Sequence, residues 1–149
     1  MKALHTLVII IASIISAVTI TSCDIEIDSN GALDGYWHLT SVDTLKTGGT
    51  RDMTNNKIFW SVQKNLLGAR DLQNGNGEII FRFKHTGDSL LLSNPFLVDR
   101  DKGDTKITNT DNLYPLGINE INDSFLVEKL QGEKMILKSK VVRLNFLKF

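Results

Sequence analysis

Few residues in this chain could carry out chemistry, and they lie far apart in the sequence. There is one cysteine, Cys23, and only two histidines follow it, His38 and His85. No nucleophile turn and no helical metal motif accompanies these histidines. The run from Asp99 to Asp104 holds three carboxylates, but it lacks the regular spacing and the distant glutamate of an EF-hand calcium loop. We therefore predict no enzyme activity, no metal and no cofactor, and we interpret the acidic run as a solvated loop.

Cys23 has the surroundings of a lipid attachment site. It follows Lys2, an apolar run from Leu7 to Ile20, and the tetrad that Cys23 itself completes, Ile-Thr-Ser-Cys. These residues resemble the lipobox of bacterial lipoproteins, in which the cysteine thiol is acylated and becomes the first residue after cleavage. The alternative is an uncleaved anchor, because the apolar segment approaches the ~20 residues that span a bilayer. We predict a signal peptide over residues 1–22 and a lipidated tether over residues 23–32.

The segment from Asp24 to Ser29 alternates acidic residues with isoleucines. It is similar to the acidic export signal of surface-exposed Bacteroidetes lipoproteins, and without that resemblance it would be a solvated linker. The resemblance implies a protein of the bacterial cell envelope, held at the outer membrane through the lipid on Cys23. Its domain would then face the periplasm or the cell surface.

Composition limits the remaining chain to one domain, residues 33–149. Removing residues 1–22 takes away one of 17 basic residues, Lys2, and none of the 17 acidic ones, so the net charge becomes −1. Nothing in this balance suggests binding of nucleic acid. With Cys23 acylated there is no cysteine left for a disulfide, so packing must stabilise the domain.

Short alternating segments between turn signals predict an all-β protein. Glycine-containing turns recur, and no long segment has a helical period. The last segment carries apolar residues on both faces, which predicts either cover on both sides or an exposed patch. The stretch from Asp99 to Asn122 is too long for a hairpin turn, and it is either a hidden strand near Thr105 to Thr108 or a mobile surface loop. We predict strands over residues 33–45, 57–65, 66–72, 78–85, 89–96, 123–130, 134–138 and 140–149.

The first predicted strand opens with Gly35, one spacer and Trp37. This pattern is similar to the Gly-x-Trp signature of the lipocalins, and the closing run from Phe125 to Leu137 looks like the small lipocalin-like lipoproteins of gut Bacteroidetes. The resemblance implies a single antiparallel up-and-down β-barrel of about eight strands. It also implies a basic residue packed over the indole, and we match Arg143 to that position.

The resemblance further implies that the barrel binds or carries a small, partly apolar molecule. Barrels of this size either hold one small ligand or fill with side chains, and aromatic residues decide which. The candidate ligand-binding residues are Trp60, Phe81, Phe83, Tyr114 and Phe125. They could equally form the core, in which case a filled barrel would dock an envelope protein through an exposed face.

Overall fold

Ten strands and two short 3-10 helices make up residues 30–149, the part of the chain that the computed structural model describes. Cys23, the predicted signal peptide and most of the predicted tether lie outside these residues. The predicted start of the domain at residue 33 falls at the end of the first 3-10 helix, just before the first strand. The elements are η1 Gly31–Leu33, β1 Gly35–Thr44, β2 Thr50–Asp52, β3 Ile58–Gln63, β4 Leu66–Asp71, β5 Glu78–Thr86, β6 Ser89–Leu97, β7 Thr105–Lys106, η2 Tyr114–Leu116, β8 Ser124–Gln131, β9 Lys134–Lys138 and β10 Val142–Lys148.

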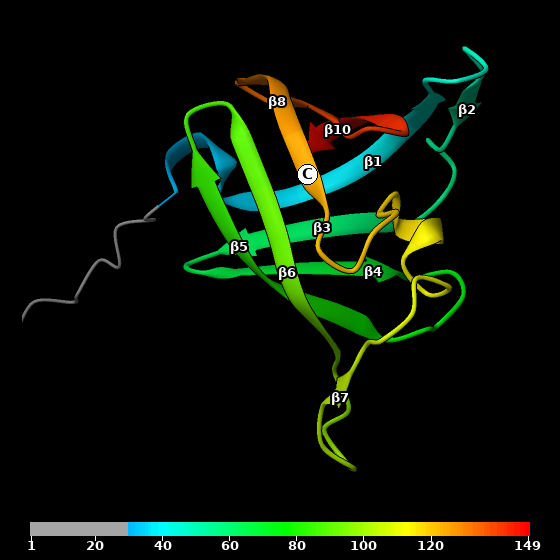
Figure 1. The fold of residues 1–149 in the computed structure, drawn as a ribbon, viewed down its shortest axis with the longest axis vertical. Coiled ribbons are helices and arrows are strands. Elements are labelled where there is room, and N and C mark those ends of the chain that lie inside the picture. Colours follow the sequence, from blue (N-terminus) through cyan, green and yellow to red (C-terminus); the bar gives the residue numbers. More distant parts are fainter. Residues whose placement is uncertain (1–29) are drawn as a thin grey trace, which may run out of the picture.

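The eight longest strands close into an antiparallel barrel (Figure 1). They follow one another around the sheet in chain order, and β10 pairs with β1 to complete the ring. The register of this last pairing sets Trp37 opposite Lys148 and Thr44 opposite Val142. The predicted all-β, up-and-down barrel is confirmed by this order. Short turns join most of the neighbouring strands, which alternate apolar and polar residues.

Side chains that point into the barrel form one continuous apolar core. On β5 the alternation is as expected, since Ile79 and Phe81 are buried in the core while Arg82 and Lys84 are not part of it. The largest side chains with under 2 % exposure include five aromatic ones, Trp37, Trp60, Phe81, Phe125 and Phe146. The barrel is therefore filled along its interior by residues from nearly every strand.

The long segment between β6 and β8 packs against the barrel instead of forming only a surface loop. It contains the expected strand, β7, which is two residues long and extends away from the barrel with its flanking turns (Figure 1). The residues after it return, and Ile107, Leu113, Leu116 and Ile118 are buried in the same core as the strands. The sequence did not show this, because four apolar residues at irregular spacing follow neither the strand nor the helix period.

The C-terminal end of the chain, at and just after β10, presents apolar residues on the outer surface. Of the two predictions for this segment, cover on both sides or an exposed patch, this agrees with the exposed patch. Leu147 is 44 % exposed and Phe149 is 85 % exposed. The Phe149 ring meets Tyr36 and Phe59 edge-on, with centroids 6.0 and 5.4 Å away. Because the Phe149 N–H also donates to Tyr36 O at 2.8 Å, the last residue is attached to the first strand.

Among residues 30–149, no helix has both the length and the apolar character needed to cross a membrane.

Candidate functional site

Gly35 and Trp37 form one arrangement with the end of β10. The Trp37 side chain is fully buried, and its indole Nε1 donates to Leu33 O at 2.9 Å. Lys148 Nζ lies 5.0 Å from the centre of the Trp37 ring, within the range of a cation–π contact. The Lys148 side chain passes directly over Gly35, where a Cβ would lie 2.5 Å from Lys148 Cε. Glycine at position 35 thus leaves room for the lysine that covers the tryptophan.

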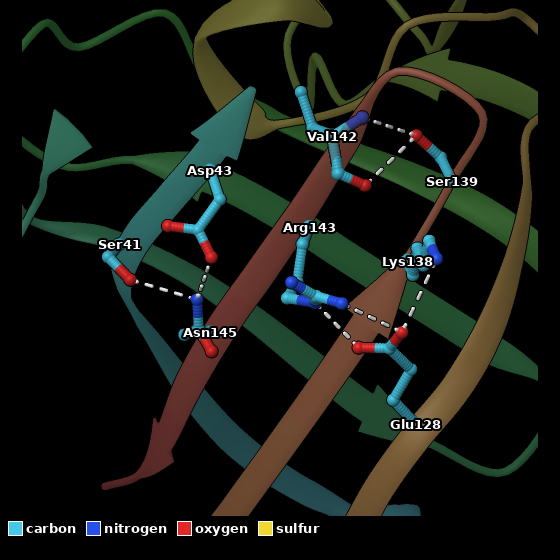
Figure 2. A network of polar contacts seen from close by, with 8 residues as sticks. All are labelled: Ser41, Asp43, Glu128, Lys138, Ser139, Val142, Arg143 and Asn145. Carbon is cyan, nitrogen blue, oxygen red and sulfur yellow. Dashed lines mark hydrogen bonds and ion pairs between the residues drawn. The ribbon is translucent and has the colours of Figure 1, made fainter. Parts of the chain in front are cut away.

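The prediction that Arg143 covers the indole is wrong. Arg143 pairs with Asp43 near the other end of β1, five residues before Lys148 on the same strand. Its guanidinium instead binds Glu128 through two contacts, Nε to Oε2 at 2.6 Å and a terminal nitrogen to Oε1 at 3.1 Å (Figure 2). The physical reason is the antiparallel register: the start of the first strand meets the end of the last one, so the covering cation comes from the end of β10.

Arg143 and Glu128 belong to a polar network on the outer surface of β1, β8, β9 and β10. Lys138 Nζ lies 3.7 Å from Glu128 Oε1, and Asn145 donates to Ser41 and Asp43 (Figure 2). The hydrogen bond from Arg143 lowers the pKa of Glu128 below its usual range, with smaller contributions from the two positive charges. All of these groups have partners, so the network is suited to holding strands together and not to binding a ligand.

We expect Glu128→Gln to remove a small, acid-sensitive part of the stability. A carboxyl with a lowered pKa stabilises the fold above its unfolded pKa of about 4.3, and this contribution disappears as the pH falls through the lowered value. Urea midpoints of the parent and the variant should therefore differ slightly at neutral pH and converge in acid, below the lowered pKa. Glu133→Gln, in the β8–β9 turn, is the control. A gap between parent and Glu128→Gln that is the same at both pH values would contradict this origin of the stability.

The five predicted ligand-binding aromatics do not surround a common pocket. Trp60, Phe81 and Phe125 are buried in the core, and the Trp60 ring packs edge-on against Phe125 with centroids 5.8 Å apart. Phe83 is half-buried, and Tyr114 lies in η2 with 55 % of its surface exposed. Four surface hollows on residues 30–149 each contain at most one of the five. Core filling, the other interpretation of these aromatics, is what the structure shows for Trp60, Phe81 and Phe125.

Trp60 also holds the segment between β6 and β8 in place. Its indole Nε1 donates to Leu116 O in η2 at 3.1 Å, and both groups are buried. Asp123, also buried, accepts hydrogen bonds from the backbone N–H groups of Asn119, Glu120 and Ser124 at the end of the segment. The indole N–H of Trp60, one of the candidate ligand-binding residues, is thus already hydrogen-bonded to the chain's own backbone.

Two adjoining hollows lie on the outside of the barrel, over β3, β4, β5 and β6. One of about 280 Å³ runs from Ser61 and Gln63 to Glu78, and one of about 240 Å³ runs from Arg82 to Asn94 and Asp104. Both are lined by Leu66 and Ile80, so they form one surface feature, which we call the outer groove. Its middle is apolar, because Leu66 and Phe96 are each 37 % exposed on this face.

Gly68 shapes the floor at one end of the outer groove. A Cβ built on this residue would clash with Glu78 Oε1 and lie 2.6 Å from Ser61 Oγ. The carboxylate and the hydroxyl thus occupy space that any other residue at position 68 would take. Leu66, Gly68 and Glu78 were not predicted from the sequence. Strand alternation could have indicated them, because it places Leu66, Gly68 and Ile80 on an outer face where polar residues are usual.

The two histidines and the acidic run from Asp99 to Asp104 either make structural contacts or have no other reactive side chain of the described chain beside them. His38 contacts Asn56 O at 2.7 Å and stacks on Phe59, and the Nε2 of His85 is buried without a hydrogen-bond partner among residues 30–149. Asp99 accepts two backbone N–H groups of its own turn, which is the behaviour of a loop carboxylate. Within the described part of the chain, no three His, Cys, Asp or Glu side chains are grouped so that they could hold a metal ion.

These features define a class: a small antiparallel barrel with a filled core, whose first strand begins with a glycine and a tryptophan covered by a cation from the last strand. A family model described as a lipocalin-like domain matches residues 18–149, and the chain belongs to this family.

Two solved structures share the fold. A lipocalin-like protein from Bacteroides uniformis is 21% identical with a TM-score of 0.60, covering 80% of this chain and 100% of its own. An uncharacterized protein from Bacteroides eggerthii is 17% identical with a TM-score of 0.51, covering 78% of this chain and 98% of its own. No curated protein matches the chain. The expected resemblance to lipocalin-like proteins of Bacteroidetes is confirmed, and the family's barrel is in general a binding fold.

Proposed function

We propose that this protein is a lipid-anchored binding protein that takes a small, partly apolar molecule on the outer groove of its barrel. The observation that carries the proposal is the groove itself, with apolar side chains in the middle and polar groups at both ends. Such a combination suits small ligands, since apolar contacts supply affinity and a few polar groups set orientation. The filled interior argues for the outside of the barrel, because Trp60, Phe81 and Phe125 already occupy the inside.

The lipid anchor and the location at the envelope are parts of the same proposal. They are supported by the lipobox-like residues that end in Cys23 and by the acidic segment that follows. The predicted tether, residues 23–32, extends at most about 3.6 Å per residue, so it would hold the barrel within about 36 Å of the membrane surface. A membrane-held binding protein of this kind would retain its ligand near the envelope without covalent chemistry.

We expect native mass spectrometry of the full lipidated protein, extracted from its host, to show a recurring small adduct. Leu66→Lys would place a charge in the middle of the outer groove and remove the adduct. Leu147→Lys is the matched control, because Leu147 is exposed on β10, away from the groove, and its replacement should leave the adduct in place. Absence of any adduct from the parent protein, or its equal loss from both variants, would contradict the proposal.

A second candidate function is docking of an envelope protein. Leu91 and Leu126 are both exposed on the outer face where β6 pairs with β8, and the register makes them diagonal neighbours. Adjacent exposed leucines are typical of a surface that a partner covers. Recovery of one stoichiometric protein with the parent, and its loss from Leu91→Lys, would support this function.

A further inference from the structure

Unusual backbone geometry borders the outer groove. The ligand inferred below rests on the proposed function, binding of a small molecule in this groove. Within residues 30–149, two residues other than glycine have a positive φ, Lys64 at 55° and Asn94 at 50°. Lys64 borders the groove at the β3–β4 turn, and Asn94 borders it on β6. At Lys64 this is the ordinary geometry of a two-residue β-hairpin turn, whereas at Asn94, inside a strand, a positive φ is uncommon and occurs more often at functional sites.

A break in strand pairing also lies at the groove. The pairing of β5 with β6 shifts register between Ile80 and Arg82, beside Asn94. Bulges of this kind change the direction of side chains and occur often next to binding sites. Here the bulge leaves Phe96 opposite Ile80 on the outer face, where the two form the apolar middle of the groove.

The polar end at Glu78 defines what the groove would bind. The Glu78 side chain is half-buried over Gly68 beside the Ser61 hydroxyl. The register sets the exposed Arg70 opposite Glu78 on β4, but no described residue makes a hydrogen bond or an ion pair with the Glu78 carboxylate. A carboxylate that is partly removed from water gains most from a charged hydrogen-bond donor. The neighbouring floor of Leu66 and Ile80 is apolar, which suits the ring or chain that would carry this donor.

We propose that the outer groove binds a small organic amine, with its ammonium group on Glu78 and Ser61 and its apolar body over Leu66 and Ile80. Arg82 lies on the same face of β5 as Glu78, about 13 Å further along at ~3.3 Å per residue. It stands at the opposite end of the groove, beyond the apolar floor. An acid bound in the reverse direction would use Arg82, which is exposed and already hydrated. The half-buried Glu78 therefore favours the amine.

The test compares two probes that share a ring and differ in charge, tryptamine and indole-3-propionate. Binding of each to the full lipidated chain in detergent micelles is measured by isothermal titration calorimetry. We expect tryptamine to bind about tenfold or more tightly than indole-3-propionate, the effect of one charged hydrogen bond. Glu78→Gln should remove this preference, and Gly68→Ala should weaken tryptamine binding because its methyl group displaces the Glu78 carboxylate.

Controls separate the possible outcomes. Glu133→Gln, an exposed carboxylate in the β8–β9 turn, should leave both affinities unchanged, and circular dichroism establishes that each variant is folded. If Gly68→Ala does not fold, Glu78→Gln decides alone, since the change keeps the size of the side chain. Equal or tighter binding of indole-3-propionate, or tryptamine binding unaffected by Glu78→Gln, would overturn the amine while leaving the proposed function in place. If neither probe binds, the amine hypothesis is also wrong. The proposed function is then tested separately by the native mass spectrometry of the protein from its host.

Discussion

Replacing Cys23 by serine is expected to abolish lipid attachment completely and to release the protein from the membrane fraction. The acyl chains need a thiol, and the variant has no other cysteine that could supply one. Each buried methylene of an acyl chain contributes about 0.8 kcal/mol to membrane binding, so two or three chains hold a protein firmly. The measurements are incorporation of labelled palmitate and fractionation of the host cells.

Ser22→Ala is the control for this experiment, because it changes a neighbouring residue and keeps the thiol. It should remain labelled and in the membrane fraction. The alternative interpretation of the N-terminus makes the opposite prediction: an uncleaved anchor would keep Cys23→Ser in the membrane, at the mass of the full chain. That result would exclude the lipoprotein and leave the barrel and its groove unaffected.

Trp60→Ala is expected to have the largest effect on folding, about 3–5 kcal/mol in the free energy of unfolding. The substitution removes a fully buried ring that packs against Phe125 and Phe146, and it leaves a cavity in the middle of the core. It also removes the hydrogen bond to Leu116 O, so the segment between β6 and β8 loses an anchor. Urea unfolding gives the free energy, and limited proteolysis reports the release of the segment.

Trp60→Phe separates the two contributions. It keeps most of the ring in the core and loses the indole N–H, so it should cost less than the alanine variant while still exposing the segment to protease. A loss below about 1 kcal/mol for Trp60→Ala would contradict a tightly filled barrel. Such a small loss would instead support the prediction that Trp60 lines a ligand-binding cavity.

Several features of the fold were predictable because they depend on local pattern. Alternating apolar residues and glycine turns located all eight barrel strands to within about two residues. Gly35 and Trp37 marked the start of the barrel through their resemblance to the lipocalin signature, which lies within three residues of one strand. In all these cases the information lies within a few neighbouring residues.

Other features depended on pairings between distant residues. Arg143 and Lys148 are both basic residues of the last strand, and only the register of β10 against β1 decides that Lys148 lies over Trp37. Likewise, the residues of the outer groove come from four strands, and nothing near Gly68 in the sequence indicates that Glu78 and Ser61 fill the space above it.

Local residue type and spacing were thus enough to predict the β class, the positions of the strands and the family. They are also the basis of the predicted lipid attachment at Cys23. Only the three-dimensional structure showed that side chains fill the barrel, that residues 107–118 pack against it, and that the groove lies on its outer surface. These depend on how side chain volumes from different strands meet, and alternation tells which side chains point inward but not whether they leave space between them.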